Sequence, residues 1–126
     1  MTRTPSLEVA VVGDGPAGSA LARGLHDRGV DVALFGHDRP WDATYTSWVD
    51  DLDGVALLDG ADIWLQRFGS VAAHFERSIT VDRDYGVIDN GALADVLRRG
   101  VEHRVGPVGS ANDVDARIVV DATAVS

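Results

Sequence analysis

The chain of 126 residues contains neither cysteine nor lysine. Without cysteine it has no disulfides, thiolate nucleophiles or cysteine metal sites. All 11 basic residues are arginines, which excludes Schiff-base catalysis and the phosphate-binding lysine of a P-loop. Four histidines, at positions 26, 37, 74 and 103, show no metal-ligand spacing. The sequence therefore predicts no metal site.

Long apolar runs and excess positive charge are also absent. No stretch approaches the roughly 20 apolar residues that a membrane-spanning helix needs, and the N-terminus has no signal-peptide pattern. We therefore expect a cytoplasmic chain without a transmembrane segment. The net charge of -9 opposes binding to nucleic acid. The length predicts one domain over residues 1–126, short for an enzyme with a separate substrate domain.

The first 36 residues carry the clearest structural pattern. Residues 7–12 form a nearly continuous apolar run that ends at glycine, typical of a strand buried on both faces. From Pro16 the apolar residues recur at helical spacing, and Gly29 is a helix stop. Residues 30–35 predict a second strand. Strand, helix and strand within about 30 residues indicate a parallel pair with a right-handed crossover.

The remaining elements are separated by a long connection over residues 36–61, rich in Gly, Asp and Pro. A helix capped by Asp89 or Asn90 is predicted from the apolar spacing of Leu93, Val96 and Leu97. Further predicted elements are a short helix over 62–68 and strands over 71–75, 101–105 and 116–121.

The loop after the first strand has the pattern GxGxxG, formed by Gly13, Gly15 and Gly18. Between a strand and a helix, the first glycine permits a tight turn, the second lets a pyrophosphate approach the backbone, and the third lets helix and strand pack closely. Pro16 suits the first helical turn. The helix N-terminus, with Ala17, offers N–H groups to phosphates. The alternative is a strand-to-helix turn that binds no ligand.

The usual companion of this motif is an acid at the end of the second strand, which binds the adenosine ribose. Here Gly36 occupies that position. Asp38 either reaches the ribose through a bent loop or is a solvated loop residue. Loss of one charge-assisted hydrogen bond would weaken dinucleotide binding by about 1 to 3 kcal/mol.

Four segments together resemble one group of flavoproteins. Gly-Asp-Gly-Pro-Ala-Gly-Ser-Ala at 13–20 is similar to the FAD-binding start of aromatic-ring hydroxylases, geranylgeranyl reductases and lycopene cyclases. The Trp, Thr-Tyr and Trp pattern of 40–51 and the Tyr, Asp-Asn and Leu pattern of 84–97 resemble the lycopene cyclase family. The strand and turn at 118–123 resemble the segment before that group's "DATG" turn.

This resemblance implies an α/β fold, a Rossmann-like FAD/NAD(P)-binding domain with a mainly parallel sheet, and FAD as cofactor. Asp121 would lie in the turn beside the cofactor, where Ala124 replaces the last glycine of DATG. Full-length relatives continue into a substrate domain, absent here, where the catalytic acids lie. The chain thus reads as the N-terminal FAD-binding part of such a protein, with its catalytic residues unknown.

The resemblance also implies a substrate region. Trp41, Tyr45 and Trp48 would line the substrate or the isoalloxazine, with Asp50 and Asp51 as polar groups there. Alternatively, the aromatic rings anchor the loop on the sheet, and the acids belong to a solvated loop.

Two functional hypotheses follow. In the first, the chain is the FAD-binding domain, or a truncated form, of a flavoprotein like the lycopene cyclases, whose full-length members cyclise linear carotenes. A C-terminal partner chain is one expected partner, and peripheral membrane contact is expected of full-length relatives. In the second, the chain is a non-catalytic α/β module that has lost the cofactor and acts as a homodimer or through a partner. Cyclisation by this chain alone is not expected. A nicotinamide-binding module would fit the glycine loop but not the cyclase-like segments.

Overall fold

The computed structural model describes residues 5–109 and 113–123. The chain divides into two compact units, which we describe separately. Unit 1 comprises Met1–Pro40 and Leu97–Ser126, and unit 2 comprises Trp41–Val96. Ala124, the predicted departure from the DATG turn, lies outside the described residues.

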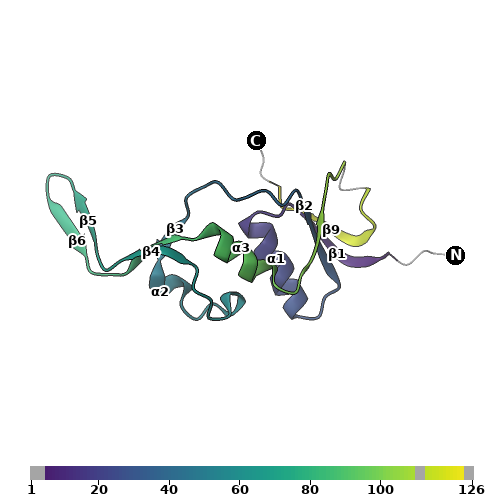
Figure 1. The fold of residues 1–126 in the computed structure, drawn as a ribbon, viewed down its shortest axis with the longest axis horizontal. Coiled ribbons are helices and arrows are strands. Elements are labelled where there is room, and N and C mark those ends of the chain that lie inside the picture. Colours follow the sequence, from purple (N-terminus) through teal and green to yellow (C-terminus); the bar gives the residue numbers. More distant parts are fainter. Residues whose placement is uncertain (1–4, 110–112, 124–126) are drawn as a thin grey trace. The chain divides into compact units, whose positions relative to one another are not determined.

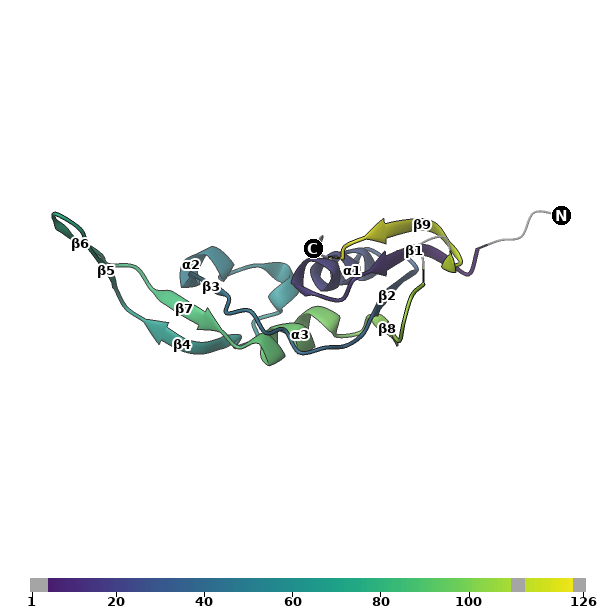
Figure 2. The ribbon, with the colours of Figure 1, turned by 90° about the horizontal axis from the view of Figure 1, so that it is seen from above.

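Unit 1 is built on a four-stranded parallel sheet with the strand order β8-β2-β1-β9, visible from above in Figure 2. Its strands are β1 (Leu7–Val12), β2 (Val32–Gly36), β8 (Glu102–Val105) and β9 (Ala116–Asp121). The central strand β1 pairs with β2 on one side and with β9 on the other. The predicted parallel α/β fold is thereby confirmed, including the strands expected near 101–105 and 116–121.

Helix α1 (Pro16–Asp27) connects β1 to β2 and lies beside the sheet of unit 1 (Figure 1). Side chains from all three elements form one apolar cluster, in which Val11, Ala22 and Leu34 are fully buried. The other face of the sheet carries a smaller cluster around Ala10 and Ala33. Burial of β1 and β2 on both faces explains their continuous apolar sequences.

Unit 2 contains short helices and two antiparallel sheets, of strand orders β3-β7-β4 and β5-β6. It also contributes most of helix α3, whose last two residues belong to unit 1. The elements are β3 (Thr46–Trp48), α2 (Val49–Leu52), η1 (Ala56–Leu58), β4 (Trp64–Phe68), β5 (Val71–His74), β6 (Ser78–Val81), β7 (Tyr85–Ile88) and α3 (Asn90–Arg98).

The prediction of a short helix over residues 62–68 is wrong, because Trp64–Phe68 forms strand β4. This strand pairs with β7, and a Cβ on Gly86 would overlap the ring of Trp64. Pairing with a distant strand outweighed the local spacing of apolar residues. The other predictions for this region are confirmed: β5 lies within 71–75, and Asp89 caps α3 by accepting a hydrogen bond from the Ala92 N–H.

None of the helices in the described part of the chain is long and apolar enough to cross a membrane.

Close packing at the start of α1 predicts how substitution of its glycines changes the stability of the fold. A Cβ on Gly18 would overlap the carbonyl oxygen of Gly13 and lie 3.3 Å from Ala122 Cβ, whereas a Cβ on Gly15 would have no heavy atom within 4 Å. We expect Gly18→Ala to lower the free energy of unfolding by about 1 to 3 kcal/mol through overpacking. Gly15→Ala is the matched control and should stay within about 0.5 kcal/mol of wild type. Urea unfolding followed by circular dichroism measures both, and equal losses would contradict the packing argument.

Candidate functional site

The glycine loop lies at the carboxyl ends of three parallel strands of unit 1. Gly13 has a φ of 114°, and its N–H donates a hydrogen bond to the carbonyl oxygen of Phe35 in β2. On the other side, the Ala122 N–H after β9 donates to the carbonyl oxygen of Val12. Crevices at this edge of open α/β sheets are the usual place of ligand binding.

The N-terminus of α1 is shaped like a phosphate cradle. Gly15 is its N-cap, no side chain makes a capping hydrogen bond there, and Pro16 follows in the first turn. The space beside Gly15 is open, because a Cβ there would meet no heavy atom within 4 Å. Backbone N–H groups and the positive end of the helix dipole favour an anion at such a terminus. The residues present therefore fit the pyrophosphate of a dinucleotide.

Asp14, between the first two glycines, connects three segments of unit 1. Its Oδ2 accepts a 2.8 Å hydrogen bond from the Asp38 N–H and lies 2.8 Å from Nε2 of His103 in β8. Arg98 Nη2 donates to the carbonyl oxygen of Asp14, Nη1 lies 2.9 Å from Asp38 Oδ1, and Nε lies 3.3 Å from Ser19 Oγ. We call Asp14, Asp38, Arg98 and His103 the Asp14 cluster.

The surroundings of the Asp14 carboxyl favour its ionised form. Burial raises its pKa, but the hydrogen bonds from the Asp38 N–H and His103, together with the positive charge of Arg98, outweigh burial and hold the pKa below its ordinary value. The side chains of Asp14, Arg98 and His103 are each 15 to 17% exposed, whereas that of Asp38 is 54% exposed. Three members of the cluster are thus mostly shielded from water.

Asp14, Asp38 and His103 each place one potential ligand atom within 4.8 Å of the other two. The guanidinium of Arg98 contacts both acidic residues, and its positive charge opposes a divalent cation there. The arrangement is better suited to binding polar groups of a ligand than to holding a metal ion.

Asp121, predicted to lie beside a cofactor, is at the end of β9. Its Oδ1 accepts hydrogen bonds from the Thr123 N–H, at 3.0 Å, and from the Thr123 hydroxyl. Because of these two bonds its pKa is lowered. The carboxylate therefore fixes the turn that follows β9, next to the Gly13 close approach.

The predicted substrate-region residues lie in unit 2, and an arginine that sequence reasoning missed brings several of them together. Arg83 lies 4.7 Å from the centre of the Trp48 ring. It also binds Asp50, through Nε at 2.9 Å, and Asp51, through Nη2 at 2.8 Å. The hydrogen bond from Arg83 outweighs desolvation and lowers the pKa of Asp50. Trp48 also packs edge-on against Tyr85 at 5.2 Å.

Trp41 and Tyr45 are held through their backbones. The side-chain amide of Asn90 donates to the carbonyl oxygen of Trp41 at 2.7 Å, and the Ile88 N–H donates to that of Tyr45 at 2.9 Å. Both side chains are half-buried. A role for these rings and for Trp48 near substrate stays a prediction, as does the alternative that they anchor their loop.

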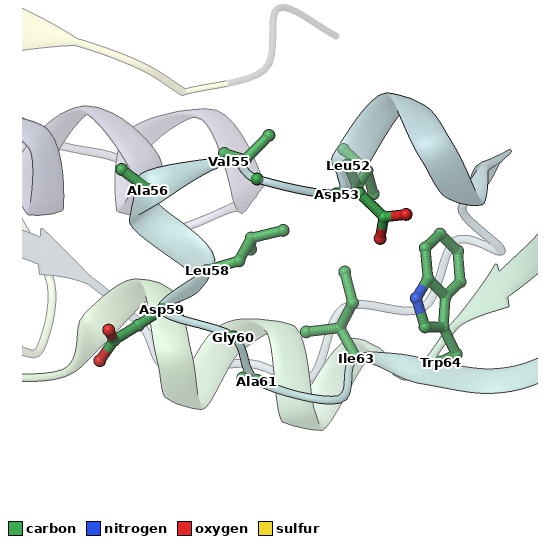
Figure 3. A pocket seen from close by; sticks show the side chains of 11 residues that line it. Leu52, Asp53, Val55, Ala56, Leu58, Asp59, Gly60, Ala61, Ile63 and Trp64 are labelled. Carbon is green, nitrogen blue, oxygen red and sulfur yellow. The ribbon is translucent and has the colours of Figure 1, made fainter.

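A separate hollow of unit 2 has a volume of about 520 Å³. Figure 3 shows Leu58 and Ile63 directed into it and Asp59 directed away from it. Its lining offers polar and apolar surface in similar measure, and Asp53 directs its carboxylate toward the hollow (Figure 3).

The residues of the two candidate sites that the sequence did not reveal are Asp14, Arg83, Arg98 and His103. Asp14 stands at a variable position of the GxGxxG pattern, and its partners Arg98 and His103 are 84 and 89 residues away. The one local signal was Gly36, where an acid was expected.

Comparison with known proteins identifies relatives. The family model described as "Lycopene cyclase protein" matches residues 8–126. An uncharacterized carotenoid cyclase of Deinococcus radiodurans is 36% identical over 96 residues, which cover 74% of this chain and 22% of that protein. A lycopene beta cyclase of Synechococcus elongatus is 27% identical over 92% of this chain and 33% of that protein. The chain thus spans about a fifth to a third of the length of these relatives.

Solved structures show the same fold. A geranylgeranyl bacteriochlorophyll reductase-like protein from Thermoplasma acidophilum aligns with a TM-score of 0.67 and 18% identity, covering 93% of this chain and 39% of that one. A flavoprotein/dehydrogenase from Cytophaga hutchinsonii aligns with a TM-score of 0.59 and 19% identity, covering 92% and 38%. The fold of the chain is that of Rossmann-like flavoproteins.

The lowered pKa of Asp14 predicts how the stability of the fold depends on pH. Because its folded pKa lies below the unfolded value of 3.8, its contribution to stability is fully present above that value and is lost as the pH falls through the folded pKa. We expect the difference in unfolding free energy between wild type and Asp14→Asn to be larger at about pH 5 than at about pH 3 and to shrink progressively below about pH 4. Urea unfolding across this range measures the difference. A difference that grows on acidification would contradict the assignment.

Proposed function

The chain belongs to the lycopene cyclase family, and from this membership and the geometry of the glycine loop we propose that it binds FAD as the cofactor-binding part of a carotene cyclase. The observation that carries the proposal is the open, uncapped N-terminus of α1 at the carboxyl ends of β1, β2 and β9. When bound, FAD would supply the isoalloxazine ring, whose chemistry the family's reaction would use.

The chain's own residues would hold the cofactor at two places. The pyrophosphate would lie over the loop formed by Gly13, Gly15, Pro16, Ala17 and Gly18, where the backbone approaches the ligand closely. The adenosine ribose would lie at the carboxyl end of β2, near the acidic side chains there, including Asp38. Asp121 would keep the turn after β9 in place through Thr123.

Cyclisation of a linear carotene is proposed for the complete flavoprotein of which this chain would form the nucleotide-binding part. In unit 2, Arg83 binds the carboxylates of Asp50 and Asp51, and we call these three residues the Arg83 cluster. The hydrogen bond from Arg83 lowers the pKa of Asp50. An acid that is to protonate a polyene must carry a proton, which a lowered pKa opposes. We therefore propose that the protonating acid is supplied by a segment other than this cluster.

FAD binding is tested by titrating the purified chain with FAD, followed by flavin fluorescence, and with ADP in a calorimeter. We expect binding at ligand concentrations of about 100 μM or below. Gly15→Val should weaken binding at least about tenfold, because the side chain fills the phosphate space, while the fold tolerates it because that space is open. The exposed Gly91 at the start of α3 gives a matched control, Gly91→Val, which should bind like wild type. Equal affinity in Gly15→Val would place the site elsewhere.

A different observation favours a second function, self-association as a non-catalytic module. In unit 2, strand β4 and the β5-β6 hairpin expose large apolar side chains: Leu65 is 69% exposed, Phe75 81% and Ile79 53%. Phe75 and Ile79 belong to the same hairpin, and exposed apolar residues that form a patch are typical of interaction surfaces.

This alternative predicts a dimer by sedimentation velocity that persists without nucleotide and that Leu65→Ser or Ile79→Ser converts to monomer. The two substitutions remove apolar area that only an interface would bury. A monomer at all concentrations excludes the second function, and a dimer that binds no FAD favours it over the first.

A further inference from the structure

We infer that Asp14 supplies the carboxylate that binds the adenosine ribose, in the place of the acid that is missing at the end of β2. The inference rests on the proposed nucleotide site and assigns one of its specificity-determining residues.

The first support is steric. Gly36 is the last residue of β2 and is buried, and a Cβ built on it would overlap the carboxylate of Asp14. Gly36 is not among the residues with positive φ in the described part of the chain, so its backbone conformation does not require glycine. The residue is small because the Asp14 carboxylate occupies the space of its side chain. The carboxylate lies where a side chain at position 36 would begin.

The second support is the way the carboxylate is held. Oδ2 of Asp14 is bound by the Asp38 N–H and lies 2.8 Å from His103 Nε2. The Asp14 side chain retains 15% exposure within a loop whose next residue is the open cradle at Gly15. Fixed in this way, the carboxylate is preorganised to accept hydrogen bonds from ribose hydroxyls next to the pyrophosphate.

Asp38 acts differently in this arrangement. It has a φ of 54°, its N–H holds Asp14, and its own carboxylate is paired with Arg98 at 2.9 Å. With these contacts the chain turns after β2, and the Asp38 N–H is directed at the Asp14 carboxylate. Asp38 is therefore a positioning residue, and Asp14 is the residue that contacts the ribose.

The experiment moves the carboxylate from position 14 to position 36. Wild type, Asp14→Asn, Gly36→Asp and the double variant Asp14→Ala/Gly36→Asp are titrated calorimetrically with ADP and with 2′,3′-dideoxy-ADP, which lacks both ribose hydroxyls. In wild type, ADP should bind at least about tenfold more tightly than the dideoxy compound, as expected for hydrogen bonds to a charged group. Asp14→Asn should reduce this preference to about twofold or less.

The single and double variants at position 36 make the assignment specific. Gly36→Asp alone should lose ADP affinity and thermal stability, because two carboxylates would compete for one space. The double variant should recover the preference for ADP, since the carboxylate is then returned to β2. A variant Asp38→Gly keeps the N–H and permits the positive φ, but it removes the carboxylate and its ion pair with Arg98, so it should lose less of the ADP preference than Asp14→Asn loses.

Each outcome is decisive. A wild-type chain that binds neither nucleotide overturns the proposed function and this inference with it. Binding of ADP with an unchanged preference in Asp14→Asn, or a larger loss of the preference in Asp38→Gly than in Asp14→Asn, overturns the inference and leaves the FAD site standing. Circular dichroism and the unfolding midpoint establish that each variant folds. If Asp14→Asn does not fold, the double variant decides. Recovery of the ADP preference in the double variant supports the inference, and continued loss of the preference overturns it.

Discussion

The Asp14 carboxylate is the contact on which the geometry of the proposed nucleotide site depends. It joins the glycine loop to the chain after β2, through the Asp38 N–H, and to β8, through His103. Arg98 adds a bond to the Asp14 backbone. A mostly shielded carboxylate needs such partners, because burial of an unpaired charge costs several kcal/mol. The cluster therefore stays together as a unit, and the loop conformation is fixed by long-range contacts as well as by its glycines.

The glycines solve a different problem, the close approach of α1 to the sheet. Gly18 leaves no room for a Cβ against the Gly13 carbonyl, and Gly13 in turn lies against the backbone of Ala122. Three strand ends and one helix end are thereby drawn together within unit 1. Among the three glycines of this loop, only Gly15 faces open space. Packing alone requires Gly13 and Gly18, whereas the proposed ligand would account for Gly15.

Much of unit 1 could be predicted from the sequence because its signals are local. A continuous apolar strand, a glycine turn and a helix with a 3.6-residue period each constrain a few adjacent residues, and β1, α1 and β2 formed as expected. Strand β4 was missed because its conformation depends on pairing with β7 about 20 residues later. The Asp14 cluster was missed for the same reason. From the sequence, Gly36 indicates the loss of a ribose-binding acid. In the structure, the space beside Gly36 is filled by the side chain of Asp14.

Arg98 and Arg83 each make a set of contacts that lysine could not make. Arg98 uses three nitrogens on three different acceptors, in Asp14, Asp38 and Ser19, and Arg83 spans Asp50 and Asp51 while covering the Trp48 ring. A guanidinium presents five N–H donors in a planar fork, whereas an ammonium is a compact charge that could not hold these partners in the same directions. With 20 acidic residues against 11 arginines, each guanidinium that serves several acceptors relieves more repulsion than a single ion pair would. Arginine at these two positions thus fixes the carboxylates of Asp38, Asp50 and Asp51. Arg98 also holds the Asp14 carbonyl oxygen, so it helps to position the segment whose carboxylate is proposed to bind the ribose.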